Sequence, residues 1–153
     1  MSLTRRTVIA LASLLVFALT ASVGVAAKSA ALPTIAPADL AAILKKPASP
    51  QPLIIQVGFK TLFDQARIPG SEFIGPGADG TGLGMLRKRL ASLKKDTFIV
   101  LYCGCCPLDH CPNVRPAEQL LTSMGFTNAK MLLLPENFGA DWVNKGYPTQ
   151  KGK

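Results

Sequence analysis

The chain has 153 residues, of which 48% are hydrophobic and 17% are charged, and its formal net charge at pH 7 is +8. A chain of this length most simply forms one domain, and the apolar content excludes an intrinsically disordered protein. The basic residues are scattered and no aromatic residues alternate with them, which argues against a nucleic-acid-binding surface. The positive charge favours attraction of small anions.

The first 27 residues have the pattern of an export signal. MSLTRR is a basic segment, VIALASLLVFAL is an apolar segment, and the small residues that follow suit cleavage after Ala27. The pair Arg5-Arg6 resembles a twin-arginine signal. Val8 to Ala27 is also long enough to span a bilayer, so an uncleaved anchor facing the periplasm is the alternative. We expect a periplasmic or secreted protein, whose thiols meet an oxidising compartment.

Residues 28–36 are expected to form a tether, 37–149 a single domain and 150–153 a tail. Apolar residues at helical spacing predict helices in APADLAAILKK (36–46), FKTLFDQA (59–66), MLRKRLASLKK (85–95), RPAEQLLTSMGF (115–126) and FGADWVNKGYP (138–148). Apolar runs predict strands in LIIQV (53–57), TFIVLYC (97–103) and AKMLLL (129–134), and RIPGSEFIGPG (67–77) predicts a turn and then a strand.

Two details concern the middle of the domain. GADGTGLG (77–84) lacks the lysine and hydroxyl residue that end a phosphate-binding loop, so it is interpreted as a flexible connector. In the helix after it, Met85, Leu86, Leu90 and Leu93 are expected to face inward.

Alternation of apolar strands with helices indicates an α/β fold around a mostly parallel central sheet. In open sheets of this kind, functional sites lie beyond the carboxyl ends of the strands. Cys103 lies at such an end, and a helix is expected to begin soon after it. The carboxyl edge of the sheet is therefore the predicted position of the site.

All the cysteines of the chain lie in this loop: Cys103, Cys105, Cys106 and Cys111. A thiol in a strand-to-helix turn faces backbone N–H groups and the positive end of the helix dipole, and both favour the thiolate. We expect Cys103 to rest ionised as a nucleophile, with the amides from Gly104 to Cys106 as an anion cradle. Arg115 would add a planar donor fork for sulfate-like or phosphate-like groups.

From Pro37 to Thr149 the sequence resembles the rhodanese-like family. LIIQV resembles the first core strand of that family, ARIPGSEFI its signature turn through Ile68-Pro69-Gly70, and IVLYC its active-site strand. LLTSMGFTNAKML resembles the next helix and strand, and the residues Trp142 and Gly146 to Pro148 resemble the closing segment. The resemblance implies a three-layer fold, with helices flanking a mostly parallel sheet.

The resemblance also implies an activity. Cys103 would accept a sulfane sulfur as a persulfide and hand it to a nucleophile, with Arg115 as a second catalytic residue and Gly104, Cys105 and Cys106 binding the substrate. The donor would be thiosulfate or another small sulfur-containing anion, and the acceptor a thiol or a cyanide-like molecule. A monomer without cofactor is expected. The sequence departs from the family pattern at Gln56, where an aspartate is usual, and in its longer cysteine loop.

The remaining thiols leave other interpretations open. Cys105, Cys106 and Cys111 are accessory thiols with three alternative roles. They could resolve a persulfide on Cys103 or form a structural disulfide, or the clustered cysteines could make the chain a thiol-disulfide redox protein. All four cysteines and His110 also form a set of five soft or borderline ligands for Cu(I) or Zn(II), which would make the chain a non-catalytic metal-binding or interaction module. Neighbouring thiols rarely bind one ion together, which argues against the metal.

The other polar and aromatic residues near the loop are assigned structural roles. Asp109 and His110 are interpreted as exposed loop residues, and Asn113 as the cap of the helix that follows. Phe138 and Trp142 are expected in the core.

Overall fold

Strands and helices alternate along the chain in the computed structural model, which describes residues 31–46, 48 and 50–152. The strands are β1 (Thr34–Ile35), β2 (Leu53–Gln56), β3 (Glu72–Phe73), β4 (Ile99–Tyr102) and β5 (Ala129–Leu132). The helices are α1 (Pro37–Leu44), α2 (Lys60–Gln65), α3 (Gly80–Leu90) and α4 (Val114–Ser123), and two short turns of other helix types cover Leu108–His110 and Gly139–Val143.

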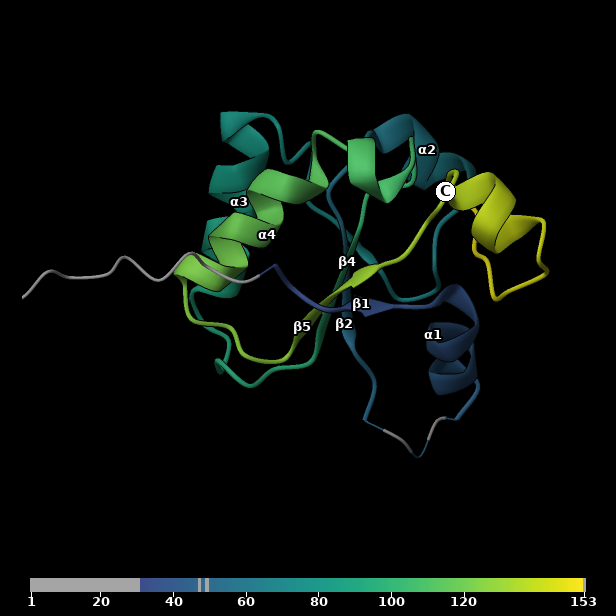
Figure 1. The fold of residues 1–153 in the computed structure, drawn as a ribbon, viewed down its shortest axis with the longest axis horizontal. Helices are drawn as coiled ribbons and strands as arrows, with labels where there is room; N and C mark the ends of the chain where they lie inside the picture. The colour runs from purple at the N-terminus through teal and green to yellow at the C-terminus, as the bar shows by residue number, and fades with distance from the viewer. Residues whose placement is uncertain (1–30, 47, 49, 153) are drawn as a thin grey trace, which may run out of the picture.

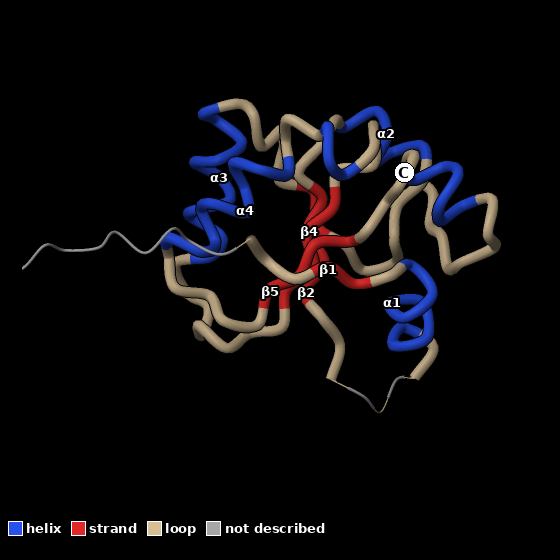
Figure 2. Tube along the Cα trace, viewed as in Figure 1, coloured by secondary structure: helices blue, strands red, loops and turns tan. Residues whose placement is uncertain are grey.

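All described strand pairs are parallel, and the sheet has the order β1-β5-β4-β2-β3. The β4 strand is therefore central, between β2 and β5. The helices α3 and α4 lie on one side of the sheet, and α1 and the short helical turn Gly139–Val143 lie on the other (Figures 1 and 2). The predicted α/β class, with a parallel sheet between two helical layers, is confirmed.

The side chains of β4 show why this strand is apolar throughout. Ile99 and Leu101 face the core that α3 and α4 cover, whereas Val100 and Tyr102 face the core that contains Trp142. Since side chains alternate along a strand, Cys103 continues the first set and points to the α3 and α4 side. A strand buried on both faces needs apolar residues at every position.

Segments on both sides of the predicted domain, 37–149, pack against it or pair with it. Leu32 is buried, and Thr34–Ile35 pairs with β5 as an edge strand, so the expected tether is too long at its C-terminal end. A two-residue strand is too short to give a periodic signal. At the other end, Gln150 exchanges two backbone hydrogen bonds of 2.9 Å with Arg67, so the expected tail is also partly folded.

The interpretation of residues 77–84 as a flexible connector is wrong, because α3 begins at Gly80. The side chain of Asp79 accepts a hydrogen bond of 2.9 Å from the N–H of Thr81 and so caps the helix. Gly82 packs so closely that a Cβ there would overlap the carbonyl oxygen of Pro76. In the same helix Leu86 and Leu90 are buried as expected, but Met85 is 49% exposed.

The predicted export signal and the alternative anchor, both within residues 1–27, lie outside the described residues. Within the described ranges, the structure contains no helix of the length and hydropathy needed to cross a membrane.

Candidate functional site

The four cysteines lie in the loop that leads from the carboxyl end of β4 to α4. Cys103 directly follows the strand, and Gly104 has a φ of +92°, a conformation that side chains with a Cβ rarely adopt. Two backbone hydrogen bonds fix the loop to the next segment: Phe138 N–H donates to the Gly104 carbonyl at 3.1 Å, and Leu108 N–H donates to the Leu134 carbonyl at 2.9 Å. The loop is therefore held in one conformation.

The loop brings the sulfur atoms together without joining them, since all four cysteines are free thiols. The Sγ atoms of Cys103 and Cys105 are 3.3 Å apart, and those of Cys105 and Cys106 are 3.0 Å apart. Cys103 and Cys111 are each 2% exposed, whereas Cys105 and Cys106 are half-buried. The cluster thus has two inner and two outer thiols.

The pKa values of the thiols in this cluster are shifted in opposite directions. The hydrogen bond from the Cys103 thiol, together with the backbone N–H groups of Val114 and Asn113 at the beginning of α4, lowers the pKa of Cys111 to about 5 despite its burial. The same hydrogen bond to Cys111, followed by burial, raises the pKa of Cys103. Burial is also the main cause that raises the pKa of Cys106 to about 12.

The expectation that Cys103 rests ionised is therefore wrong. The reason is the length of the loop, which brings the first amides of α4 to Cys111 instead of Cys103. The amides from Gly104 to Cys106 were expected to form an anion cradle. The N–H of Cys105 does reach the Cys103 sulfur and lowers its pKa, but Cys111 and burial together raise that pKa by more.

Gln56 braces the backbone of Cys103 from the neighbouring strand. Its Nε2 atom donates to the Cys103 carbonyl at 2.9 Å, and its Oε1 atom accepts from the Gly58 N–H at 3.3 Å. Gly58 itself packs against the thiol, since a Cβ there would lie 2.7 Å from the Cys103 oxygen and 2.8 Å from its sulfur. This role of Gln56 was not predicted from the sequence, although a polar residue in an apolar strand is a signal for a buried hydrogen bond.

Asn113 contacts the thiol cluster directly. Its Nδ2 atom donates to the Cys103 sulfur at 3.4 Å, and its Oδ1 atom accepts from the Ala78 N–H at 3.1 Å. The residue precedes α4, but its side chain makes no capping hydrogen bond. The prediction of a helix cap is thus wrong, because the side chain turns inward to join two loops.

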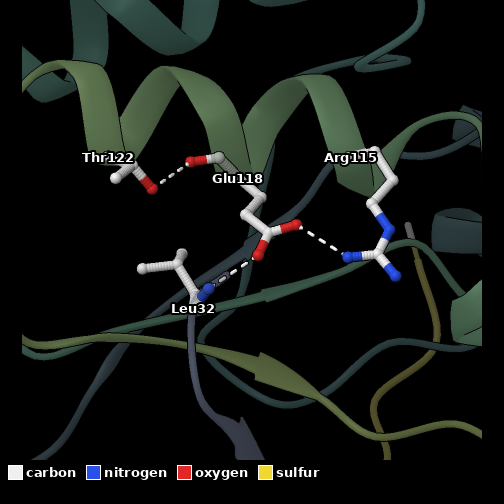
Figure 3. A network of polar contacts seen from close by, with 4 residues as sticks. All are labelled: Leu32, Arg115, Glu118 and Thr122. Atoms are coloured by element: carbon white, nitrogen blue, oxygen red, sulfur yellow. Dashed lines mark hydrogen bonds and ion pairs between the residues drawn. The ribbon is translucent and has the colours of Figure 1, made fainter. Parts of the chain in front are cut away.

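Arg115 is directed to another part of the molecule (Figure 3). Its guanidinium pairs with Glu118 at 3.1 Å, and the second carboxylate oxygen of Glu118 accepts from the Leu32 N–H at 2.6 Å. The side chain of Glu118 is 6% exposed and that of Arg115 is 46% exposed. Glu118 therefore joins the segment before β1 to α4, Arg115 pairs with Glu118 within the same helix, and Arg115 lines neither cavity at the thiols.

Two cavities adjoin the thiols: a small one, and a larger one that we call the open cavity. The small cavity, about 10 Å³, is lined by Cys103, Gly104, Cys106, Leu108, Cys111, Val114, Leu132 and Leu134. The open cavity, about 250 Å³, is lined by Leu62, Gln65, Ala66, Gly104, Cys105, Asn137, Phe138, Gly139 and Val143. The first has room for about one water-sized particle, and the second for a small molecule. Cys105 faces the open cavity, and Cys103 faces the small one.

Comparison with known proteins gives the name of this architecture. No family model matches the sequence, and no curated protein matches it. The rhodanese-like domain of the Alr3790 protein from Anabaena is 22% identical over 78% of this chain and 79% of its own, with a TM-score of 0.56. A rhodanese-related protein from Thermoplasma volcanium is 19% identical over 77% of this chain and 97% of its own, with a TM-score of 0.54.

The chain has a rhodanese-like fold. A third similar structure, the RPA3614 protein from Rhodopseudomonas palustris, is described as a possible tyrosine phosphatase. It is 23% identical over 78% of this chain and 85% of its own, with a TM-score of 0.56. These identities establish the fold, and the activity has to be argued from the site.

In this rhodanese-like fold the signature turn supports the strand that carries Cys103. The Tyr102 hydroxyl lies 3.4 Å from the Ile68 N–H, which donates to it, and 3.3 Å from the Ser71 hydroxyl. Burial raises the pKa of Tyr102 to about 12, so the ring stays neutral. Phe138 and Trp142 are buried as expected, and the Trp142 indole donates to the Pro148 carbonyl at 2.8 Å.

Of the predicted site residues, those of the cysteine loop lie together, whereas Arg115 pairs with Glu118 and lies apart from them. The structure brings Cys103, Gly104, Cys105, Cys106 and Cys111 together around two cavities. It also exposes Asp109 and His110, as expected. Chemically, the site offers the buried Cys103 thiol next to Cys111, whose pKa is lowered, and the outer Cys105 thiol that lines the open cavity.

Proposed function

We propose that the protein is a sulfurtransferase that carries a sulfane sulfur as a persulfide on Cys103. The observation that carries the proposal is the position of the Cys103 and Cys111 sulfurs, which lie within 4.8 Å of each other at the carboxyl end of β4. A thiol is a weak nucleophile until an adjacent base takes its proton. We assign this role to Cys111, because its sulfur lies next to that of Cys103 and its lowered pKa favours the thiolate.

In the first half-reaction the Cys103 sulfur attacks the outer sulfur of thiosulfate, and the proton of the thiol passes to Cys111. The S–S bond of the donor breaks, and sulfite leaves with the electron pair. In the second half-reaction the thiolate of an acceptor attacks the outer sulfur of the persulfide. The Cys103 thiolate leaves and recovers its proton from Cys111, so each half-reaction balances without an added oxidant or reductant.

The cavities support the same proposal. The donor enters the open cavity, whose wall contains Gly104 and Cys105, and reaches Cys103 when the Cys105 side chain turns aside. The outer sulfur of the persulfide then occupies the small apolar cavity beside Cys103, which has room for about one atom. The net charge of the chain, +8, favours an anionic donor. The proposal includes export, on the pattern of residues 1–27.

The test is an intact-mass measurement of the reduced full-length protein after incubation with thiosulfate. The expected result is a gain of one sulfur atom in the wild type, reversed by cyanide, and no gain in Cys103→Ser. Cys111→Ser should take up sulfur more slowly at neutral pH, because Cys103 lacks its base. Loss of that difference at high pH, where solvent removes the proton, would support the assigned role of Cys111. An unchanged mass in the wild type would contradict the proposal.

A second function, thiol–disulfide exchange, is favoured by the sulfur distances of 3.3 Å and 3.0 Å from Cys105 to Cys103 and Cys106. Closing a bond between two of these thiols would remove two electrons and release two protons to an oxidised partner. This function predicts a loss of two free thiols on oxidation, restored by a dithiol, with no gain of mass from thiosulfate. A count of free thiols before and after each treatment separates the two functions.

A further inference from the structure

Three of the four sulfur atoms converge on one point. The Sγ atoms of Cys103, Cys105 and Cys111 all lie within 4.8 Å of one another. An ion at the centre of a triangle with sides of about 4 Å would be about 2.3 Å from each corner, which is the length of a metal–thiolate bond. The three sulfurs therefore need only small rotations of their side chains to bind one ion.

The fourth thiol lies outside this group. Cys106 is 3.0 Å from Cys105 and also interacts with Cys111, but it does not belong to the group of three whose sulfurs all lie within 4.8 Å of one another. The structure thus removes the objection that adjacent thiols rarely bind one ion, because the three converging residues are not adjacent in the sequence. The turn at Gly104, with its φ of +92°, directs Cys103 and Cys105 to the same side.

The surroundings of the three sulfurs suit a resident ion. Cys103 and Cys111 are each 2% exposed, and the small cavity beside them is walled by leucine and valine side chains. Cys105 reaches the open cavity of about 250 Å³, which gives an ion a path from solvent. Hydrogen bonds from Asn113 and from the Val114 N–H orient the two inner sulfurs and offset their negative charge.

The donor set selects the class of ion. Three soft thiolates in an apolar site favour Cu(I), whereas zinc in structural sites takes four ligands in a tetrahedron. The loop residues with harder ligand atoms, Asp109 and His110, are both exposed and contribute nothing to the group of three. We propose that Cys103, Cys105 and Cys111 form a three-thiolate site for a single Cu(I) ion. Binding of this ion uses two of the thiols of the proposed sulfur transfer, but it does not depend on that activity and is measured without it.

The test is an anaerobic titration of the reduced full-length protein with Cu(I) against a chromophoric Cu(I) chelator. The wild type should hold one equivalent and show thiolate-to-copper absorbance in the ultraviolet. Cys106→Ser is the matched control and should keep that equivalent. Cys105→Ser and Cys111→Ser should each release it to the chelator. Asn113→Ala should bind about 10–100-fold more weakly, because it lacks the hydrogen bond that orients Cys103.

Circular dichroism of each variant without metal shows whether it is folded, and Cys105→Ser, at a half-buried position, is the variant whose folding is least at risk. The proposal is overturned if the wild type gives its copper to the chelator, if Cys105→Ser holds it as tightly as the wild type, or if Cys106→Ser loses it. Preferential retention of Zn(II) would also overturn it. Sulfur uptake is measured separately on chelator-treated protein, so each proposal can fail alone.

Discussion

Gly58 is the residue whose substitution tests the packing around Cys103 most sharply. A methyl group at this position would lie 2.7 Å from the Cys103 oxygen and 2.8 Å from its sulfur. Ordinary contacts are at roughly 3.5 Å, so the overlap is about 0.8 Å. The backbone of Gly58 has no positive φ, so the effect of Gly58→Ala comes from this overlap and not from backbone strain.

The expected cost of Gly58→Ala is about 1–3 kcal/mol in the free energy of unfolding, typical of overpacking in a core. For a domain of this size each kcal/mol lowers the melting temperature by roughly 4 °C, which gives a fall of about 4–12 °C. The displaced thiol should also take up sulfur from thiosulfate about 10–100-fold more slowly, because misplacement of a reacting atom by about 1 Å has effects of that order.

Gly84→Ala is the matched control. Gly84 lies in α3, and a Cβ there meets no atom within 4 Å. Alanine is the better helix former, so this variant should gain about 0.5–1 kcal/mol and keep its sulfur uptake. The two variants are compared by thermal unfolding and by intact mass after timed incubation. Gly58→Ala with the melting temperature and uptake rate of the wild type would refute the described packing of Cys103.

Three further predictions concern stability. Gly82→Ala should cost about 1–3 kcal/mol in thermal unfolding, since its methyl group overlaps the Pro76 carbonyl; no loss would contradict the close packing of α3. Arg115→Ala should cost about 1–3 kcal/mol, because it removes a partner of the buried Glu118 carboxylate, and equal stability in urea would argue against that network. In reduced, metal-free protein, the lowered pKa of Cys111, about 5, should make stability rise with pH from about 5 to 9, where the unfolded thiol still holds its proton. Above pH 9 stability should fall, because Cys103 and Cys106 lose their protons in the unfolded chain but keep them in the fold. The free energy of unfolding is measured in urea over this pH range, and a rise below pH 9 that is equally large in Cys111→Ser would contradict this account.

The central strands could be predicted from the sequence because burial on both faces leaves a continuous apolar run. LIIQV and TFIVLYC predicted β2 and β4 to within a few residues. The beginning of α3 could not be predicted in this way. GTGLG is a poor helix former by composition, and the Asp79 cap and the contact of Gly82 with Pro76 outweigh that propensity.

The site was predicted as a location but not as an arrangement. That the thiols lie at the carboxyl edge of the sheet follows from the order of strand, cysteine and helix. Which thiol receives the amides of α4 depends on the path of the long loop, and this path depends on contacts distant in sequence. The bond from Gln56 to Cys103 and the bond from Ala78 to Asn113 are such contacts, and local patterns carry no information about them.

The central claim is that Cys103 carries the transferred sulfur. It is tested most directly by treating the reduced full-length protein with thiosulfate, blocking the thiols, and locating the added sulfur by fragmentation of the peptide that contains all four cysteines. The account predicts one added sulfur, on Cys103. Added sulfur on Cys105, Cys106 or Cys111 alone, or none at all, would contradict it.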